Sequence, residues 1–407
     1  MYFYKGQKDI LEKIDLDKQI AEAQKEILKV FSVHNLSFLL GSGCSSLVEE
    51  DTEIGIPTMA PMAKEYYNSL DGTQKEYIID SIKINIDLFP YDNNLEKFLE
   101  VLFSYKYLLE SQGNKRELVI LCQLINHTKD FIFSKCVNQE KTVIDLYKSF
   151  YRKLVYRDSN LSKINIFTTN YDLFSERALD QLGIIFSNGF SGTIERYFNP
   201  AVFNYAFAEQ MELSNNKWNV IDNFIYLYKL HGSVNWIEDE TSKQLFKIRE
   251  IQEPKLEKTS VMIYPTPVKQ NASFGSPYSD LFREFQKKLM KNNNVLITVG
   301  YSFSDEHINN LIYQALTIPT FRLVVVGNKD AININKLYEL NDPRIWIIGE
   351  EGKWDDDKLS KIPVHFFSRI VNELLPEIDG QGEIEKSIDA IKTLFSEHPS
   401  TKVNESE

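Results

Sequence analysis

The side chains best suited to chemistry in this sequence are an amide and an imidazole, each at the end of a run of strand-forming residues. Asn170 lies in TTNYD at 168–172, and His231 lies in KLHGS at 229–233. An amide donates and accepts hydrogen bonds from one planar group, and a neutral imidazole accepts a proton near pH 7. We therefore predict that Asn170 and His231 are catalytic, together with Asp172, the acid at the end of the first segment.

Each of these residues also has a simpler structural interpretation. Asp172 precedes a helical run at 173–182, where an aspartate commonly caps the helix N-terminus. Asn170 could serve as a turn residue, and a single histidine is most often packed and hydrogen-bonded. The position of His231 among similar segments favours a chemical role for it, whereas both roles of Asp172 stay open.

Two other segments combine glycine with small hydroxyl residues after a strand. LLGSG at 39–43 continues into Ser45, and VGYSFSD at 299–305 opens a helical run. Glycine lets the backbone approach a ligand closely, and N–H groups at a helix N-terminus favour an anion. We predict that these segments bind nucleotide phosphates and that residues at neighbouring strand ends add contacts. The predicted binding residues are Gly41, Ser42, Gly43, Ser45, Thr169, Gly300, Ser302, Ser304 and Asn328.

Both glycine segments have alternatives. An ordinary β-turn explains a short glycine segment such as 41–43, and Ser304 or Asp305 could act as a helix cap. The first segment also lacks the third glycine of the usual dinucleotide fingerprint, which disfavours a standard dehydrogenase.

The parallel strands of an α/β sheet are expected to carry these segments. Repeated strand-to-loop transitions of this kind are typical of a doubly wound, Rossmann-like fold, which binds ligands at the carboxyl ends of its strands. Between 58 and 160 glycine is sparse and apolar residues recur at helical spacing, which predicts an inserted all-helical domain. We also expect a hairpin over 234–246 and a terminal helix over 383–396. The predicted units are 1–57 (N-terminal helix, over 8–32, and the first part of the Rossmann-like domain), 58–160 (inserted helical domain), 161–375 (remainder of the Rossmann-like NAD-binding domain) and 376–407 (C-terminal helix and flexible tail).

The composition excludes several classes of protein. The chain has 407 residues, of which 43% are hydrophobic, so it can build a sizeable core. Its net charge of −12 disfavours direct binding to nucleic acid. It has no apolar signal-peptide core at its start and no run of about 18 apolar residues, so we expect a cytoplasmic protein without a membrane span. Cys44, Cys122 and Cys136 match no disulfide framework or common zinc pattern, so we expect no metal site and no structural zinc.

In these segments the chain resembles the sirtuin fold family. That family follows a GAGxS loop with a GIP segment, and here GSGCSS at 41–46 is followed by GIP at 55–57. TTNYD at 168–172 is similar to the family's TQNID, HG at 231–232 to its catalytic HG, and GYS at 300–302 to its GTS phosphate loop. The resemblance implies a sirtuin-like fold with NAD⁺ in the crevice.

The same resemblance implies roles for individual residues. It makes Asn170 and His231 catalytic, Asp172 the acid that ends the motif, and Asn328 a late contact to a ribose. The chain departs from the family's deacylases in two ways. It lacks their four-cysteine zinc module, and Thr58-Met59 stands where they carry an aromatic–arginine pair. Both departures disfavour protein deacylation.

Three features resemble the bacterial antiphage branch of sirtuin-like proteins. They are the motif GYSFSD, the helical insertion and the missing zinc module. This resemblance implies that NAD⁺ is the substrate and is hydrolysed to nicotinamide and ADP-ribose, which depletes the infected cell. It also implies a stand-alone subunit that pairs with a HerA-type hexameric ATPase. From the apolar faces of the N-terminal helix and the insertion we further expect a homo-oligomer. The alternatives are an NAD-dependent protein deacylase and a module that senses NAD⁺ or an ADP-ribose derivative without cleaving it.

Overall fold

The centre of the protein is a nine-stranded sheet. The computed structural model describes residues 1–49, 52–155, 157, 160–210, 218–243, 245–255, 260–262, 276–355 and 358–376. The strand order in this sheet is β2-β1-β18-β17-β16-β3-β6-β12-β7. The strands are β1 (Tyr2–Lys5), β2 (Lys8–Asp9), β3 (Asn35–Leu40), β6 (Asn165–Thr168), β7 (Ile185–Ser187), β12 (Phe224–Lys229), β16 (Asn294–Val299), β17 (Arg322–Val326) and β18 (Ile345–Gly349).

The seven strands from β18 to β7 are parallel, and β1 and β2 add an antiparallel margin. Strand β3 comes first in the chain among the parallel strands. The chain then builds β6, β7 and β12 on one side of β3, and β16, β17 and β18 on the other. The order of connection therefore reverses between β3 and β16. In open α/β sheets such a switch point leaves a crevice at the carboxyl ends of the strands, where ligands bind.

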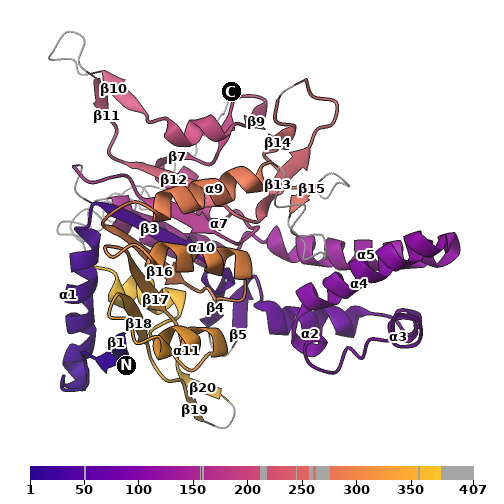
Figure 1. The fold of residues 1–407 in the computed structure, drawn as a ribbon, viewed down its shortest axis with the longest axis horizontal. Coiled ribbons are helices and arrows are strands. Elements are labelled where there is room, and N and C mark those ends of the chain that lie inside the picture. The colour runs from indigo at the N-terminus through magenta and orange to yellow at the C-terminus, as the bar shows by residue number, and fades with distance from the viewer. Residues whose placement is uncertain are drawn as a thin grey trace, which may run out of the picture.

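Helices cover both faces of this sheet (Figure 1). Side chains alternate along a strand, so Phe38 joins the hydrophobic cluster on one face and Leu39 the cluster on the other. The first cluster contains residues of α1 (Gln19–Phe31), α6 (Lys141–Val155) and α7 (Phe174–Leu182). The second contains residues of α9 (Tyr278–Leu289), α10 (Glu306–Leu316) and α11 (Ile332–Glu339). The predicted doubly wound α/β fold is confirmed.

The helical insertion follows a short hairpin of β4 (Ser46–Glu49) and β5 (Thr52–Gly55). Asp71 caps α3 through the backbone N–H of Gln74, and Gly113 ends α4 in the left-handed conformation at φ +70°. Both breaks follow from ordinary capping preferences. Figure 1 shows α4 and α5 as a pair that projects away from the sheet. The helices are α2 (Met59–Ser69), α3 (Gly72–Tyr77), α4 (Leu95–Gln112) and α5 (Lys115–Cys136).

A second, antiparallel sheet has the order β15-β13-β14-β9-β8. The sequence predicted only a hairpin over 234–246 in this region. Trp236 of β13 is fully buried, and its ring lies 4.9 Å from that of Phe190. Because β13 begins directly after His231, this sheet holds one side of the predicted site. The strands are β8 (Phe190–Ser191), β9 (Arg196–Phe198), β13 (Gly232–Glu238), β14 (Ile248–Glu250) and β15 (Ser260–Met262).

The prediction of one helix over 8–32 was wrong in its first half, because α1 begins at Gln19. The preceding residues form β1 and β2, joined by a turn in which Gly6 has φ +63°. The Asp9 carboxylate accepts the backbone N–H groups of Phe3 and Leu11 and fixes this turn. The helix predicted over 383–396 lies outside the described residues, and the domain boundaries stay a prediction. None of the described helices combines the length and apolar character that crossing a membrane requires.

Candidate active site

Strands β3 and β16 are neighbours, so the two glycine segments that follow them meet at the switch point. The N–H of Gly41 donates to the carbonyl of Val299 at 2.9 Å. The N–H of Gly43 donates to the carbonyl of Gly300 at 3.1 Å. The carboxyl ends of the two central strands are therefore joined, as the predicted site requires.

The glycines in these two segments are needed for the approach of one backbone to the other. A Cβ atom on Gly41 would lie 2.7 Å from the Cα of Tyr301, and one on Gly43 would lie 2.9 Å from the Cα of Gly300. Gly300 has φ +61°, which also favours glycine. The sequence interpretation attributed these glycines to phosphate binding, but the structure gives a packing reason for them. Phosphate binding by this loop pair stays a prediction.

Asn170 is hydrogen-bonded to the first glycine segment. Its Nδ2 donates to the carbonyl of Gly41 and to Oγ of Ser45, both at 2.9 Å. Its backbone N–H donates to Oγ1 of Thr168 at 3.0 Å, which orients the turn after β6. Both amide hydrogens are directed into the protein, and Oδ1 accepts no hydrogen bond among the described residues. The carbonyl end of the side chain is therefore the end that can accept a hydrogen bond from a ligand.

Asp172 makes the helix-end hydrogen bond that the sequence suggested and a second hydrogen bond, and its catalytic role stays a prediction. Its Oδ1 accepts the N–H of Phe174 at 3.0 Å, at the first residue of α7. Its Oδ2 accepts the hydroxyl of Ser45 at 2.6 Å, and Ser45 in turn accepts from Asn170. The aspartate thus stabilises the start of a helix and also holds the serine that positions the amide of Asn170.

Helix α6 reaches this network through Tyr147. Its hydroxyl lies 3.5 Å from Oγ of Ser45. Burial raises the pKa of Tyr147 well above its ordinary value, and the charge of Asp172 adds to the effect. Tyr147 is therefore a neutral phenol beside the serine. Only its helical spacing marked it in the sequence.

His231 lies in the turn between β12 and β13 and is buried. Its ring faces Tyr171 of the TTNYD segment at a centroid distance of 6.4 Å. Its Nε2 lies 3.0 Å from Oδ2 of Asp305. Segments that are far apart in the sequence, 168–172, 229–233 and 299–305, therefore converge around this imidazole. The sequence interpretation treated Asp305 only as a possible helix cap.

A buried ion pair lies next to the predicted site. It was not predicted from the sequence. Nζ of Lys229 lies 3.0 Å from Oε1 of Glu176, and it also donates to the backbone carbonyls of Tyr171 and Asp172. Burial raises the pKa of Glu176, and the charge of Lys229 opposes that shift. This lysine joins the end of β12 to the loop that carries Asn170.

The remaining predicted binding residues are half-buried or exposed and lie just beyond the ends of central strands. Ser302 and Ser304 are exposed, and the Ser302 hydroxyl donates to that of Ser304 at 3.0 Å. Thr169 is half-buried, and Ser42 is exposed. Asn328 is exposed two residues after β17, the neighbour of β16, and its Oδ1 accepts the N–H of Asp330 at 3.0 Å. All of these positions follow the carboxyl ends of central strands, as predicted.

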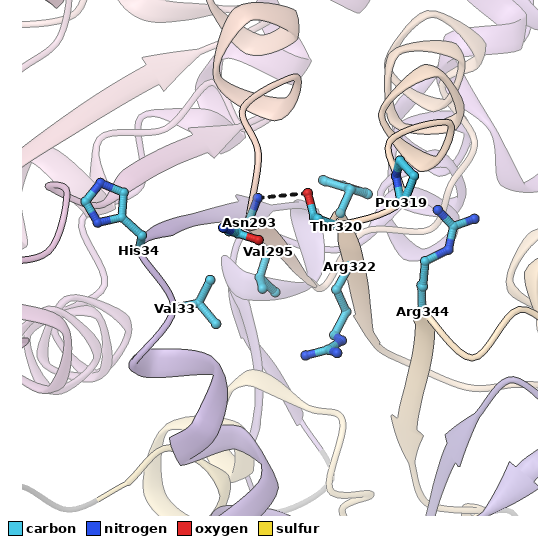
Figure 2. A pocket seen from close by; sticks show the side chains of 9 residues that line it. Val33, His34, Asn293, Val295, Pro319, Thr320, Arg322 and Arg344 are labelled. Atoms are coloured by element: carbon cyan, nitrogen blue, oxygen red, sulfur yellow. Dashed lines mark hydrogen bonds between the residues drawn. The ribbon is translucent and has the colours of Figure 1, made fainter.

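Two further features of the described residues bear on ligand binding. Among the described residues, no group of three histidine, cysteine or acidic side chains is arranged to hold a metal. A hollow of about 490 Å³ lies at the opposite, amino ends of β3, β16 and β17, and none of the predicted site residues lines it. Figure 2 shows the side chains of Arg322 and Arg344 in this hollow pointing away from each other. Asp342 and two backbone carbonyls already bind the guanidinium of Arg344.

A comparison with protein families finds a match over part of the chain. Residues 164–330 match the model of the SIR2-like domain, and this segment contains Asn170, His231 and Gly300. The protein thus contains a SIR2-like domain, and the first glycine segment lies ahead of the matched residues. No curated protein sequence matches the chain.

Solved structures that are similar to the chain include sirtuins. A Sir2 homologue mutant in complex with ADP-ribose is 15% identical, with 79% of this chain and 94% of that chain covered and a TM-score of 0.31. A second such mutant complex is 14% identical, with 90% and 98% covered and a TM-score of 0.33. A complex of Sir2 with a p53 peptide and NAD⁺ is 13% identical, with 78% and 96% covered and a TM-score of 0.33.

Proposed function

We propose that this protein is an NAD⁺ glycohydrolase that cleaves NAD⁺ to nicotinamide and ADP-ribose. The observation that carries the proposal is the convergence of Asn170, Asp172 and His231 at the switch point, within a SIR2-like domain. An amide with a free carbonyl end and a buried imidazole are the groups that a reaction at a ribose carbon needs.

The proposed reaction breaks the bond between the ribose and the pyridinium nitrogen. The bonding electron pair leaves with nicotinamide, which departs as a neutral base and needs no general acid. Water forms the new bond to the anomeric carbon, and its proton passes to His231 and then to solvent. Asn170 would hold the water or a ribose hydroxyl through Oδ1, and general-base help of this kind contributes roughly 10²–10⁴-fold to the rate.

The paired glycine segments at 41–45 and 300–304 are proposed to hold the pyrophosphate, with Asn328 near a ribose. They flank the crevice in the place where doubly wound folds bind dinucleotides. In this proposal the exposed hydroxyls of Ser302 and Ser304 meet the phosphates, and the buried Ser45 positions Asn170 instead.

We further propose that the activity serves antiphage defence in the cytoplasm, that the protein forms a homo-oligomer, and that a HerA-type ATPase regulates it. The support is the resemblance of GYSFSD and of the helical insertion to that branch of sirtuin-like proteins. Uncontrolled hydrolysis of NAD⁺ would kill a healthy cell, so restraint by assembly is expected.

Chromatography of NAD⁺ after incubation with the purified protein tests the proposal, both for the protein alone and for its mixture with a HerA-type ATPase. We expect nicotinamide and ADP-ribose in equal amounts, and loss of both products with His231→Ala or Asn170→Ala. His307→Ala is the matched control, because His307 lies in the first turn of α10 and outside the proposed reaction. NAD⁺ that is bound but unchanged would indicate a sensor. Acetyl-ADP-ribose formed with an acetylated peptide would indicate a deacylase.

A further inference from the structure

The two oxygens of the Asp305 carboxylate make different contacts. Oδ1 caps α10 by accepting the N–H groups of His307 at 2.9 Å and Ile308 at 3.3 Å. Oδ2 lies 3.0 Å from Nε2 of His231. The side chains of Asp305 and His231 are each about 10% exposed, so water screens this contact little.

Two other helix caps show what the capping role alone requires. Asp71 caps α3 and Asn94 caps α4 through hydrogen bonds at the exposed surface. Any serine, asparagine or aspartate satisfies that role. The oxygen of Asp305 that faces the imidazole is not needed for the cap, so the cap alone does not explain why an acid occupies this position.

The contact selects which ring nitrogen carries the proton. An ionised carboxylate can only accept a hydrogen bond, so the nitrogen that faces it is stabilised as N–H. Nε2 is the buried nitrogen, and its N–H does not point straight at Oδ2, so the contact is a short electrostatic pair. With the proton on Nε2, the lone pair lies on Nδ1.

We infer that Asp305 is a positioning residue that holds His231 in the tautomer with Nε2–H and leaves Nδ1 as the base. The inference deepens the proposed hydrolase function and rests on it for the role of the base. When Nδ1 takes a proton from the attacking water, the same carboxylate stabilises the imidazolium that forms. Because Asp305 also begins α10, the orientation of the base depends on the position of that helix.

Two substitutions remove the negative charge of Asp305 and keep its helix-capping role. Asp305→Ser and Asp305→Asn both keep a side chain that caps helices well, but neither keeps the negative charge beside His231. Asp71→Ser, the same exchange at an exposed cap, is the matched control for stability. We expect both Asp305 variants to melt within a few degrees of the wild type, as the control does.

The decisive measurement is nuclear magnetic resonance of the full chain with isotope-labelled histidine, which reports the tautomer of each ring. The signal of His231 among the six histidines is assigned by its loss in His231→Asn. We expect Nε2–H in the wild type and a mixture of tautomers in Asp305→Ser. A wild-type ring protonated on Nδ1, or a tautomer that Asp305→Ser leaves unchanged, would overturn the inference.

Turnover supplies a second readout. Supporting groups of this kind commonly contribute about 10–100-fold, so we expect kcat of Asp305→Ser to fall by that factor while KM for NAD⁺ changes little. An equal kcat would contradict the positioning role. If the wild type does not cleave NAD⁺, the proposed function fails, but the tautomer measurement still decides whether Asp305 sets the state of His231.

Discussion

Nζ of Lys229 lies 3.0 Å from Oε1 of Glu176, and the two side chains are only 1% and 10% exposed. The same ammonium group donates to the carbonyls of Tyr171 and Asp172. Lys229 stands two residues before His231, and the two carbonyls follow Asn170. This buried pair therefore fixes the distance between the strand that carries the imidazole and the loop that carries the amide.

Lys229→Met should destabilise the protein by about 3 kcal/mol, because it leaves the Glu176 carboxylate buried without its partner. The double variant Lys229→Met, Glu176→Gln should recover part of the loss, since no unpaired charge remains. Thermal unfolding of the two variants and the wild type measures both effects. A single variant as stable as the wild type would show that the pair contributes nothing, and a double variant no better than the single would show that the charge is not the cause.

Gly41→Ala should reduce folding as well as activity, because the added methyl group would meet the backbone of Tyr301 at 2.7 Å. Overpacking of this kind commonly costs about 1–3 kcal/mol. Gly72→Ala is the control: a Cβ atom there would meet nothing within 4 Å, and the change should be neutral or slightly stabilising. Melting temperatures and yields of folded protein compare the two. If both variants were equally stable, the segment at Gly41 could move away from Tyr301 at little cost, and the close approach would not require glycine.

Ser45→Ala should lower kcat by a larger factor than the loss of folded protein alone would cause. The serine hydroxyl links Asn170 to Asp172, so its loss leaves both side chains with an unmet hydrogen bond. We expect a roughly 10–100-fold loss of kcat, as for other supporting groups, and about 1–3 kcal/mol of destabilisation. Ser46→Ala, one residue along, removes a hydroxyl that bonds to Glu53 instead and is the matched control. Similar turnover in both variants would remove Ser45 from the site.

His365 should make the protein less stable in acid. Burial lowers its pKa from 6.5 to about 4, against the opposing effect of Glu350. The folded state therefore favours the neutral ring, and this contribution is complete above pH 6.5 and is lost as the pH falls through about 4. At most it amounts to roughly 3 kcal/mol, from 1.36 kcal/mol for each pKa unit.

The variant His365→Asn tests this pH dependence because it cannot titrate. Its melting temperature should fall less steeply than that of the wild type as the pH is lowered from 6.5 towards 4. His34→Asn, at an exposed histidine, should follow the wild-type profile. Parallel profiles for all three proteins would exclude His365 as the titrating group.

Much of the fold could be predicted because hydrophobic spacing and turn residues are local signals. The strand before Gly41, the break at Gly113 and the helix after Asp305 all follow from such signals. Strands β1 and β8 were missed because they are short and are stabilised by partners remote in the sequence. Their pairing depends on tertiary structure more than on their own residues.

The candidate site was predictable as a set of segments but not as a set of contacts. Asn170, Asp172 and His231 were found because polar residues follow strands. Lys229 was missed because a lysine at a strand end normally suggests solvent exposure, and only the buried Glu176 shows otherwise. The second contact of Asp305 was missed because a capping motif already explained the residue.

The two edge strands of the nine-stranded sheet limit how copies of the protein could associate. One margin is β2, with only two residues, and the other is β7, with three. Such short outer strands offer a neighbouring chain very few unpaired backbone groups. Growth of this sheet by adding strands from one molecule to the next is therefore disfavoured.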